Sequence, residues 1–405
     1  MLKRYFLNNK KRNFSTASIW IKGGSDMDST GKKGINKILC SLLTRGCEGF
    51  NNFTLSEYIE SYGAELNQEI FEDGISISIK SLNEHFSKLF PLLDLIINKP
   101  ILSETEFKKV KKSSIDHIKK DKENPFNICF EKWRKIVYSN HPYAFNTIGN
   151  ANDVSKITYE DVLLEFKNLK NREKYLISNN PEINGENFGT LEKKILKEKS
   201  DPLNHNLNTT NRFDYINNDS NQTIIMMGDQ TCSRRSSEYF PLKVLESYLS
   251  YGMSAALFKL FREKHGITYD LGVYYPIRSG NAPFLIYLSV SNEQALFAFE
   301  LLSTLWKNLL FNPLTDAEIF LAKEKLKGSF LLGNQSLDEI LQRKIQLVSY
   351  GISPISENDL NSKIEEISSL DIFKLTNKYF SKPFLSISGN KNICLEISNR
   401  WKKNF

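Results

Sequence analysis

The sequence predicts an α+β protein made of two similar layered domains, each a sheet with helices, and three observations lead to this fold class. One pattern of residues occurs twice, about half of the 405-residue chain apart. Each copy follows a strand-like segment and an apolar helical segment in the same order. The chain is 40% apolar and 25% charged, near the averages for globular proteins, which excludes a disordered or fibrous class.

The first predicted elements are a strand and an amphipathic helix. Ala17 to Ile21 alternates as a strand does and is followed by two glycines. In residues 34–44 the apolar side chains recur with the spacing of a helix, which predicts a core-facing stripe. The neighbouring face of that helix carries Lys37, Cys40 and Ser41.

The first 25 residues carry six cations and no acidic side chain. Such a composition is typical of an organellar transit peptide, and that alternative stays open. The strand predicted at residues 17–21 favours the other interpretation, in which folded structure begins almost at once. No apolar stretch follows the first cations, so we do not expect a secretory signal.

The repeated pattern lies at residues 98–110 and 312–323. In both copies Asn and Pro precede a hydroxyl residue, and an acidic residue follows the hydroxyl by three positions. Each copy predicts a capping box that opens a helix, formed by Ser103 with Glu106 and by Thr315 with Glu318. The preceding segments match as well, with strands over 74–80 and 284–291 and helices over 84–97 and 293–310.

This duplication divides the chain into two domains and a connection. We expect an N-terminal domain at residues 1–187, a linker at 188–220 and a C-terminal domain at 221–405. The linker region is dense in Asn, Asp, Gly, Ser and Thr, which are typical of loops. One short helix is predicted within it, at residues 191–199.

A helix followed by a strand is predicted in the second half. Apolar side chains in residues 255–261 indicate the helix, and Gly266 is expected to end it as a C-cap. Apolar and aromatic residues then alternate with period two from Ile267 to Ile277, as in a strand. Arg262 and Tyr269 stand seven residues apart, across this turn.

Several motifs follow one another along the chain. They are Ile19-Trp20-Ile21-Lys22-Gly23-Gly24-Ser25 before Gly34, His141-Pro142-Tyr143 with Ile148-Gly149, Gly252-Met253-Ser254, and Phe261 to Tyr269. In this order they resemble the insulinase, pitrilysin and mitochondrial-processing-peptidase family, the inverted zincins. The resemblance covers nearly the whole chain and implies one half of a clamshell metallopeptidase, in which two such chains enclose a chamber.

In that family the helix at residues 34–44 carries the zinc motif His-x-x-Glu-His. The resemblance places the first His at Lys37, the Glu at Cys40, the second His at Ser41, and the third ligand, a Glu, at or next to His117. Lys37 offers three donors and no acceptor, and Ser41 is a poor zinc ligand. With only Cys40 and His117 able to coordinate, we expect no catalytic residue and no metal in this chain.

The histidines support the same expectation without any resemblance. The chain has five, and no two of them lie within four residues of each other. No single turn of helix can therefore present the His pair that zinc peptidases use.

Arg262 and Tyr269 resemble the pair that contacts bound peptide in the family. A guanidinium and a phenol can donate to the carbonyl oxygens of an extended peptide whatever its side chains are. The alternative stays open that Arg262 is a solvated helix end and Tyr269 a core aromatic. One departure is Ala255-Ala256, where the family often has an arginine.

The resemblance and the lost motif together suggest a non-catalytic, substrate-binding subunit of a heterodimeric zinc metalloendopeptidase that acts on short or unfolded peptides. The chain would be inactive alone, and its partner would hold the zinc with an intact motif. A catalytically dead structural scaffold is an alternative. Another is an autonomous peptidase with an atypical metal site around Cys40, Asp116 and His117.

The composition also indicates partners and location. Five scattered cysteines without a C-x-x-C pair favour reduced thiols in the cytoplasm. A net charge of +7 makes no concentrated basic footprint, so we expect no nucleic-acid partner. We expect no membrane span, because the most apolar run, Leu89 to Ile97, is far shorter than the roughly 18 residues required and contains Pro91 and Asp94.

Overall fold

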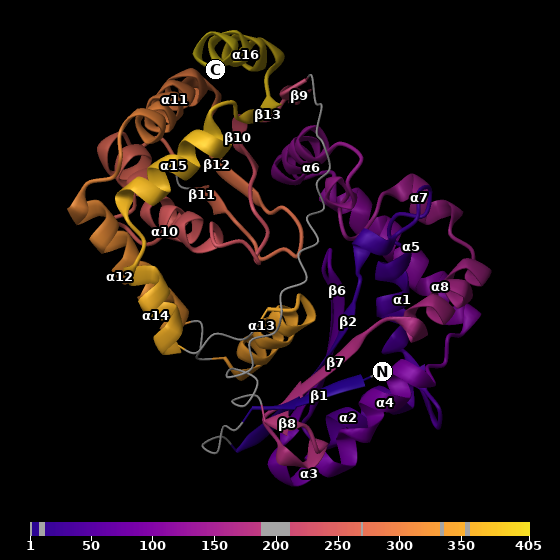
Figure 1. Ribbon diagram of the computed structural model, residues 1–405. Coiled ribbons are helices and arrows are strands. Elements are labelled where there is room, and N and C mark those ends of the chain that lie inside the picture. The colour runs from indigo at the N-terminus through magenta and orange to yellow at the C-terminus, as the bar shows by residue number, and fades with distance from the viewer. Residues whose placement is uncertain (1, 8–12, 188–210, 269, 333–335, 353–356) are drawn as a thin grey trace. The chain divides into compact units, whose positions relative to one another are not determined.

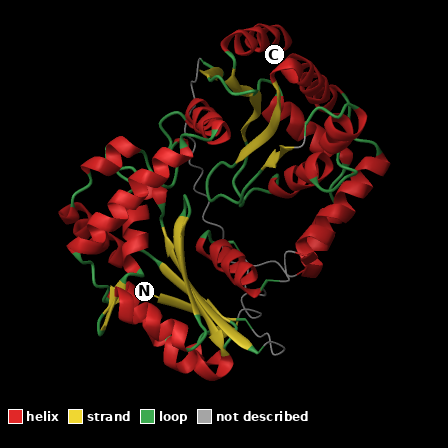
Figure 2. Cartoon of the chain, turned by 180° about the vertical axis from the view of Figure 1, so that it is seen from behind, coloured by secondary structure: helices red, strands yellow, loops and turns green. Residues whose placement is uncertain are grey.

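The computed structural model describes residues 2–7, 13–187, 211–268, 270–332, 336–352 and 357–405. They fold into two compact units, each with strands side by side and helices against them (Figures 1 and 2). Unit 1 consists of Met1–Lys120, Phe145–Ser200 and Gly333–Ile355, and unit 2 of Asp121–Ala144, Asp201–Leu332 and Ser356–Phe405. The predicted mixed fold with two sheet-and-helix domains is confirmed.

The described residues of unit 1 form a six-stranded sheet in the order β5-β6-β2-β7-β1-β8. Its strands are β1 (Leu2–Phe6), β2 (Phe14–Lys22), β5 (Glu65–Ile70), β6 (Gly74–Leu82), β7 (Lys174–Ser178) and β8 (Glu186–Asn187). β2 pairs antiparallel with β6 and β7, β5 pairs antiparallel with β6, and β1 pairs parallel with β7. A separate small ribbon joins β3 (Gly46–Cys47) to β4 (Phe50–Asn51).

The described residues of unit 2 form a five-stranded sheet with the same plan, in the order β11-β12-β10-β13-β9. Its strands are β9 (Phe213–Asn217), β10 (Gln222–Gln230), β11 (Asp270–Tyr274), β12 (Pro283–Ser291) and β13 (Phe384–Gly389). The central pairs are antiparallel and β13–β9 is parallel, as β7–β1 is in unit 1. Apart from β8, which has no counterpart among the described strands of unit 2, the two sheets have the same order and pairing, as the two-half plan predicts.

Helices cover both sheets. In unit 1 they are α1 (Ile35–Leu43), α2 (Asn52–Ser61), α3 (Asn83–Leu89), α4 (Pro91–Asn98), α5 (Glu104–Asp121), α7 (Ala151–Lys156), α8 (Tyr159–Asn171) and α13 (Leu337–Ser349). In unit 2 they are α6 (Pro125–Tyr138), α10 (Tyr239–Ser250), α11 (Ala295–Phe311), α12 (Asp316–Leu332), α14 (Glu357–Glu365), α15 (Ser369–Phe380) and α16 (Lys391–Asn404).

The two faces of the sheet in unit 1 are buried by different partners. Ile19 and Ile21 of β2 belong to the large core that includes Ile38 of α1. Trp20, on the opposite face because strand side chains alternate, packs in a second cluster with Leu341 of α13. Both faces of β2 are therefore apolar, as expected for a central strand covered on both sides.

Two helices of equivalent position are exchanged between the units. α6 follows the helix that the first repeat opens, yet it packs on β9, β10 and β13 of unit 2. α13 follows the helix that the second repeat opens, yet it packs on β2 and β7 of unit 1. The sequence expectation of a domain at 1–187 and another at 221–405 therefore does not describe where these two helices pack.

The linker expected at 188–220 is described only in part. Residues 188–210, which include the helix predicted at 191–199, lie outside the described residues. Phe213–Asn217, at the end of the expected linker, forms β9 and pairs with β13. By pairing there, this segment covers an edge of β13 that would otherwise be open.

Several predicted elements differ in their bounds. The helix expected over 84–97 is two helices, α3 and α4, and Pro91 occupies the first turn of the second, where proline is favoured. The strand expected from Ile267 to Ile277 is shorter, since β11 covers Asp270–Tyr274 and pairs only with β12. An edge strand has one ladder of hydrogen bonds, so periodicity alone overestimates its length.

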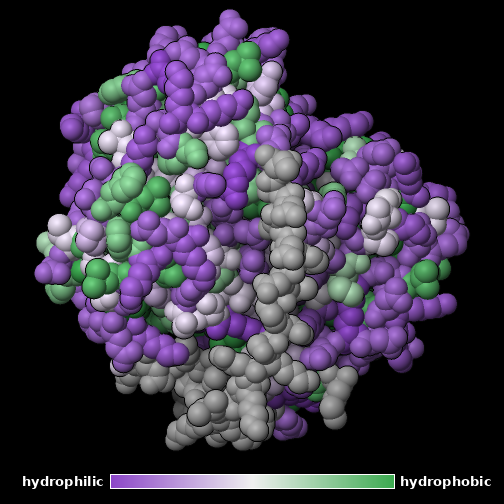
Figure 3. All heavy atoms as spheres, turned by 45° about the horizontal axis from the view of Figure 1, so that its top comes forward, coloured by the Kyte–Doolittle hydropathy of each residue, from purple (hydrophilic) through white to green (hydrophobic). Residues whose placement is uncertain are grey.

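The surface of the described residues is mixed. Figure 3 shows hydrophilic residues over most of one face, with apolar residues as smaller patches among them. On α12 the exposed apolar side chains are Phe320, Leu321, Leu331 and Leu332. Among the helices that the structure describes, none has the length and apolarity needed to cross a bilayer.

Candidate functional site

The helix α1, which carries three of the expected site positions, begins at a buried carboxylate. Asp28 accepts hydrogen bonds from the Gly34 N–H at 2.6 Å, the Asn36 N–H at 3.1 Å and the Asn36 Nδ2 at 2.8 Å. Backbone N–H groups in the first turn have no partner within the helix, so these bonds stabilise its start. Burial raises the pKa of Asp28 to about 6, and the hydrogen bonds from Gly34 and Asn36 oppose that rise.

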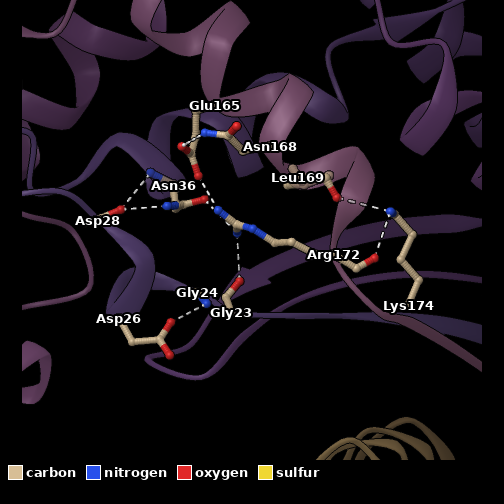
Figure 4. A network of polar contacts seen from close by, with 10 residues as sticks. All are labelled: Gly23, Gly24, Asp26, Asp28, Asn36, Glu165, Asn168, Leu169, Arg172 and Lys174. Carbon is tan, nitrogen blue, oxygen red and sulfur yellow. Dashed lines mark hydrogen bonds and ion pairs between the residues drawn. The ribbon is translucent and has the colours of Figure 1, made fainter. Parts of the chain in front are cut away.

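Arg172 connects this start of α1 to two other elements (Figure 4). Its Nη1 donates to the Gly23 carbonyl oxygen at 3.0 Å and to Asn36 Oδ1 at 3.0 Å. Its Nη2 forms an ion pair with Glu165 of α8. A planar guanidinium can make these bonds together, so the end of β2, α1 and α8 are held in one arrangement.

Two glycines of the sequence motifs allow α1 to approach its neighbouring loop. Gly34 has φ +100°, and a Cβ there would lie 2.7 Å from the Ile148 carbonyl oxygen. Gly149 has φ +79°, and a Cβ there would lie 2.1 Å from the Lys33 carbonyl oxygen. Both positions need glycine for its conformation and its size, so these motif residues have a packing role.

A cavity of about 260 Å³ lies in unit 1 between α1 and α5. Lys37 and Ser41, one turn apart on α1, line one side, and His117 of α5 lies on the lining as well. The structure thus brings together three of the four positions that the resemblance assigns to the zinc site. The remaining lining residues are Arg45, Val110, Ser113, Ser114 and Ile148.

Cys40 is the exception, because it does not line the cavity. Its side chain is fully buried in the core of unit 1, together with Leu39 and Leu43. Burial raises the pKa of the thiol to about 12, with Glu69 adding to the rise and Lys37 opposing it. A thiol in that environment stays protonated at neutral pH and is not available as a ligand or nucleophile.

Arg45, Ser113 and Ser114 also line the cavity but belong to none of the motifs in the sequence. Arg45 forms an ion pair with Glu106 at 2.9 Å, and Glu106 also pairs with Lys109 at 2.7 Å. Glu106 was expected to complete a capping box with Ser103, yet only the Ser103 hydroxyl takes part, accepting from the Glu106 N–H at 3.1 Å. The spacing of Ser113 and Ser114 from His117 on one helix was the signal that could have found them.

These residues do not fit the zinc ion of the family's active members. Zinc is bound by deprotonated thiolate, imidazole or carboxylate ligands, and it is repelled by an ammonium such as that of Lys37. The cavity offers one imidazole, and Asp116 is exposed and lies outside its lining. Across the residues that the structure describes, no three His, Cys, Asp or Glu side chains form a group that could hold a metal.

The two residues expected to contact peptide lie in unit 2. Arg262 is exposed on the π-helical segment Phe258–Lys264, with its guanidinium carbon 4.9 Å from the centre of the Phe258 ring. Tyr269 lies outside the described residues. Gly266 has φ +61° at the end of this helix, which agrees with the predicted C-cap.

β5 forms one edge of the sheet in unit 1 and packs against α1. Four of its six side chains are exposed, and among the described strands only β6 pairs with it. The N–H and C=O groups of its other edge are therefore free to pair with an additional extended segment.

Comparison with known families accounts for much of the chain. Residues 4–151 match a model described as "Insulinase (Peptidase family M16)", and residues 182–326 match one described as "Peptidase M16 inactive domain". The first match contains α1 and the cavity, and the second contains the Arg262 segment.

Relatives and solved structures of similar length agree. A Rickettsia felis protein named an uncharacterized zinc protease is 23% identical over 370 residues, covering 89% of this chain and 88% of its own. YmxG of Bacillus subtilis, which has the same description, is 22% identical, covering 96% and 99%. The peptidase M16 inactive domain structure from Pseudomonas fluorescens has a TM-score of 0.80 at 19% identity, covering 96% of this chain and 95% of its own. A protease from Helicobacter pylori has a TM-score of 0.80 at 17% identity, covering 95% and 96%.

Proposed function

This chain belongs to the insulinase family of peptidases, family M16, as a member with a degenerate zinc motif, and we propose that it is the substrate-binding subunit of a heterodimeric zinc metalloendopeptidase. The observation that supports this proposal is the cavity in unit 1, which is lined by Lys37, Ser41 and His117, the residues that the resemblance assigns to zinc-ligand positions. Peptide hydrolysis would then depend on a second chain with an intact His-x-x-Glu-His motif, which would hold the zinc.

The edge of β5 supports a role in holding peptide. A short or unfolded peptide added there would pair with backbone groups and would need no particular side chains. Glu65, Asn67 and Glu69 are exposed along this strand, and among the described strands only β6 pairs with it. The same strand packs against α1, so a peptide bound at this edge would lie next to the helix that lines the cavity.

Arg262 and Tyr269 would contribute further contacts to the peptide. Arg262 is exposed, and a guanidinium presents several donors to carbonyl oxygens. π-helical segments such as Phe258–Lys264 are rare and are frequently found at functional sites. Both features support a contact role for Arg262, while the role of Tyr269 rests on the resemblance alone.

A reconstituted pair tests the proposal. This chain is mixed with a family member from the same cell that has the intact motif, and cleavage of a quenched, unstructured peptide is measured by fluorescence. We expect the mixture to cleave the peptide and this chain alone to be inactive. Cleavage by this chain alone, with zinc bound in near-stoichiometric amount, would overturn the assignment.

Substitutions then separate substrate binding from a scaffold role. Arg262→Ala and Tyr269→Ala should each lower the rate of peptide cleavage by roughly tenfold. This is the effect expected from the loss of one hydrogen bond to a charged or strongly polar partner. Lys264→Ala, which removes an exposed cation two residues away, is the matched control. If the two chains associate but neither substitution changes cleavage, the chain is a scaffold and the contact role is wrong.

We also propose a cytoplasmic location. All five cysteines are free thiols and all are buried, so the fold uses them as small apolar side chains without a disulfide. Reduced cysteines are typical of proteins in reducing compartments.

A further inference from the structure

We propose that the cavity between α1 and α5 binds the carboxylate group of a peptide, at the place where active family members have a metal. A cation and several hydroxyl groups line this one cavity, and all of them belong to this chain, so binding would require no partner subunit.

Several donors that line the cavity have no partner among the described residues. Among the described residues, the Lys37 ammonium, the Ser41 hydroxyl and the His117 imidazole form no hydrogen bond or ion pair with other side chains or the backbone. The hydroxyls of Ser113 and Ser114, on the facing helix, also have no hydrogen-bond partner in the part of the chain that the structure describes. A ligand with several acceptor oxygens could therefore bond to both helices without displacing a native contact.

The charges on the lining favour an anion with a single negative charge. Lys37 and Arg45 are the lysine and arginine of the lining, and Lys37 forms no ion pair with any described residue. Arg45 is also cationic, but its guanidinium is paired with Glu106 at 2.9 Å. Lys109 shares the same carboxylate at 2.7 Å, which holds the pKa of Glu106 below its usual range through hydrogen bonds from Lys109 and Arg45. One unpaired positive charge matches a carboxylate better than a doubly charged phosphate.

The apolar part of the lining fits the rest of a peptide. Val110 and Ile148 provide aliphatic contact beside the polar groups. A volume of about 260 Å³ admits a carboxylate and the atoms of about one neighbouring residue, but it is too small for a folded domain. The site would accept either the carboxyl terminus of a peptide or an acidic side chain.

The isolated chain is suited to a direct binding test. The probe is acetyl-tetra-alanine with a free carboxylate, and the readout is the imidazole Hε1 resonance of His117, assigned by its loss in His117→Asn. We expect a saturable shift of this resonance with the free acid and none with the C-terminal amide. An acetylated, amidated peptide that contains one glutamate tests the side-chain source, and binding by either source supports the site.

Lys37→Gln should weaken binding of the free acid by roughly tenfold, because a charge-assisted hydrogen bond is lost. Lys112→Gln is the matched control, since Lys112 is an exposed lysine of α5 that does not line the cavity. Circular dichroism verifies that both variants remain folded.

Three results would overturn the proposal. They are no saturable shift with either carboxylate probe, an equal loss of affinity in Lys37→Gln and Lys112→Gln, and tighter binding of inorganic phosphate than of the peptide acid. The first would mean that the donors serve only water, and the second would mean unspecific attraction to a basic surface. The outcome is independent of the reconstituted peptidase, because no cleavage is measured.

Discussion

α1 and α10 follow the central strand of their sheets and have the same spacing of lysine and serine, but the surroundings of these residues are opposite. In α1, Lys37 and Ser41 line a cavity and have no partner among the described residues. In α10, the Lys243 ammonium lies 2.6 Å from Glu246 and 2.9 Å from the Tyr275 carbonyl oxygen. The Ser247 hydroxyl donates to the Ala322 carbonyl oxygen of α12 at 2.8 Å.

The difference shows that residues at equivalent positions of the two units can have different roles, stabilising the fold in one unit and binding a ligand in the other. In unit 2 the contact with α12 gives Ser247 its partner, and Glu246 and Tyr275 give Lys243 its partners, so both side chains are bonded within the fold. A cavity between α1 and α5 leaves the equivalent groups of unit 1 to a ligand. Unpaired donors around a cavity indicate binding more strongly than buried pairs do, because buried polar groups require partners for stability.

The largest expected effect comes from the buried lysine. Lys243→Met should lower the free energy of unfolding by about 3–5 kcal/mol, because Glu246 is left buried without its cation. Lys37→Met should change it by less than about 0.5 kcal/mol, since Lys37 has no hydrogen bond or ion pair with a described residue to lose. Urea denaturation followed by circular dichroism measures both. Equal losses in the two variants would contradict the contrast between the helices.

A second comparison concerns one carboxyl group in each unit. Burial raises the pKa of Asp26 to about 7, and repulsion by Asp73 adds to the rise. Burial also raises the pKa of Asp229 to about 7, although Arg212, at 3.2 Å, opposes it. Between about pH 4 and 7 the folded chain holds protons that the unfolded chain has released, so both groups make stability fall as pH rises.

Asp26→Asn should therefore stabilise the protein by on the order of 2 kcal/mol at pH 8 and have little effect at pH 4. Asp229→Asn should stabilise it less, because the substitution leaves Arg212 without its carboxylate. Thermal unfolding of the three proteins from pH 4 to 8 provides the measurement. A gain in Asp26→Asn that is the same at both ends of this range would show that the carboxyl is not the cause.

A third prediction concerns zinc binding by a variant in which two histidines are introduced into the cavity. The double variant Lys37→His/Ser41→His places two imidazoles one helical turn apart, beside His117. Three imidazoles are a known zinc-ligand set, so we expect zinc affinity to rise by roughly tenfold or more over the natural chain, by calorimetric titration. Adding His117→Ala to the double variant should reverse the gain, and an unchanged affinity would place His117 too far from α1.

The smallest effects are expected at the two repeated helix starts. Thr315 and Glu318 form a complete capping box, with the Thr315 N–H donating to Glu318 at 2.9 Å. At the first repeat, Ser103 is the only side chain that caps, because Glu106 pairs with Arg45 and Lys109. Ser103→Ala and Thr315→Ala should each cost about 1 kcal/mol in urea denaturation. A loss near zero would mean that the cap bond has no energetic role.

Much of the fold followed from local sequence. The period of Ala17–Ile21, the apolar stripe of residues 34–44 and the two hydroxyl-acid pairs depend on near neighbours, so they predicted β2, α1 and the starts of α5 and α12. Such features can be predicted from the sequence because side-chain periodicity and helix capping depend on residues only a few positions apart. The resemblance to the family assigned the zinc-motif positions to Lys37, Cys40 and Ser41, and that assignment stays a prediction.

Only the tertiary structure decided which of those residues share a site. Helical spacing put Cys40 beside Lys37 and Ser41, but packing against the core buries Cys40 and leaves the other two on the cavity. The exchange of α6 and α13 between the units could not be predicted either, since the apolar pattern of an amphipathic helix is the same whichever unit it packs on. Burial depends on contacts between segments far apart in the chain, and a periodic pattern states that a face is buried without stating what covers it.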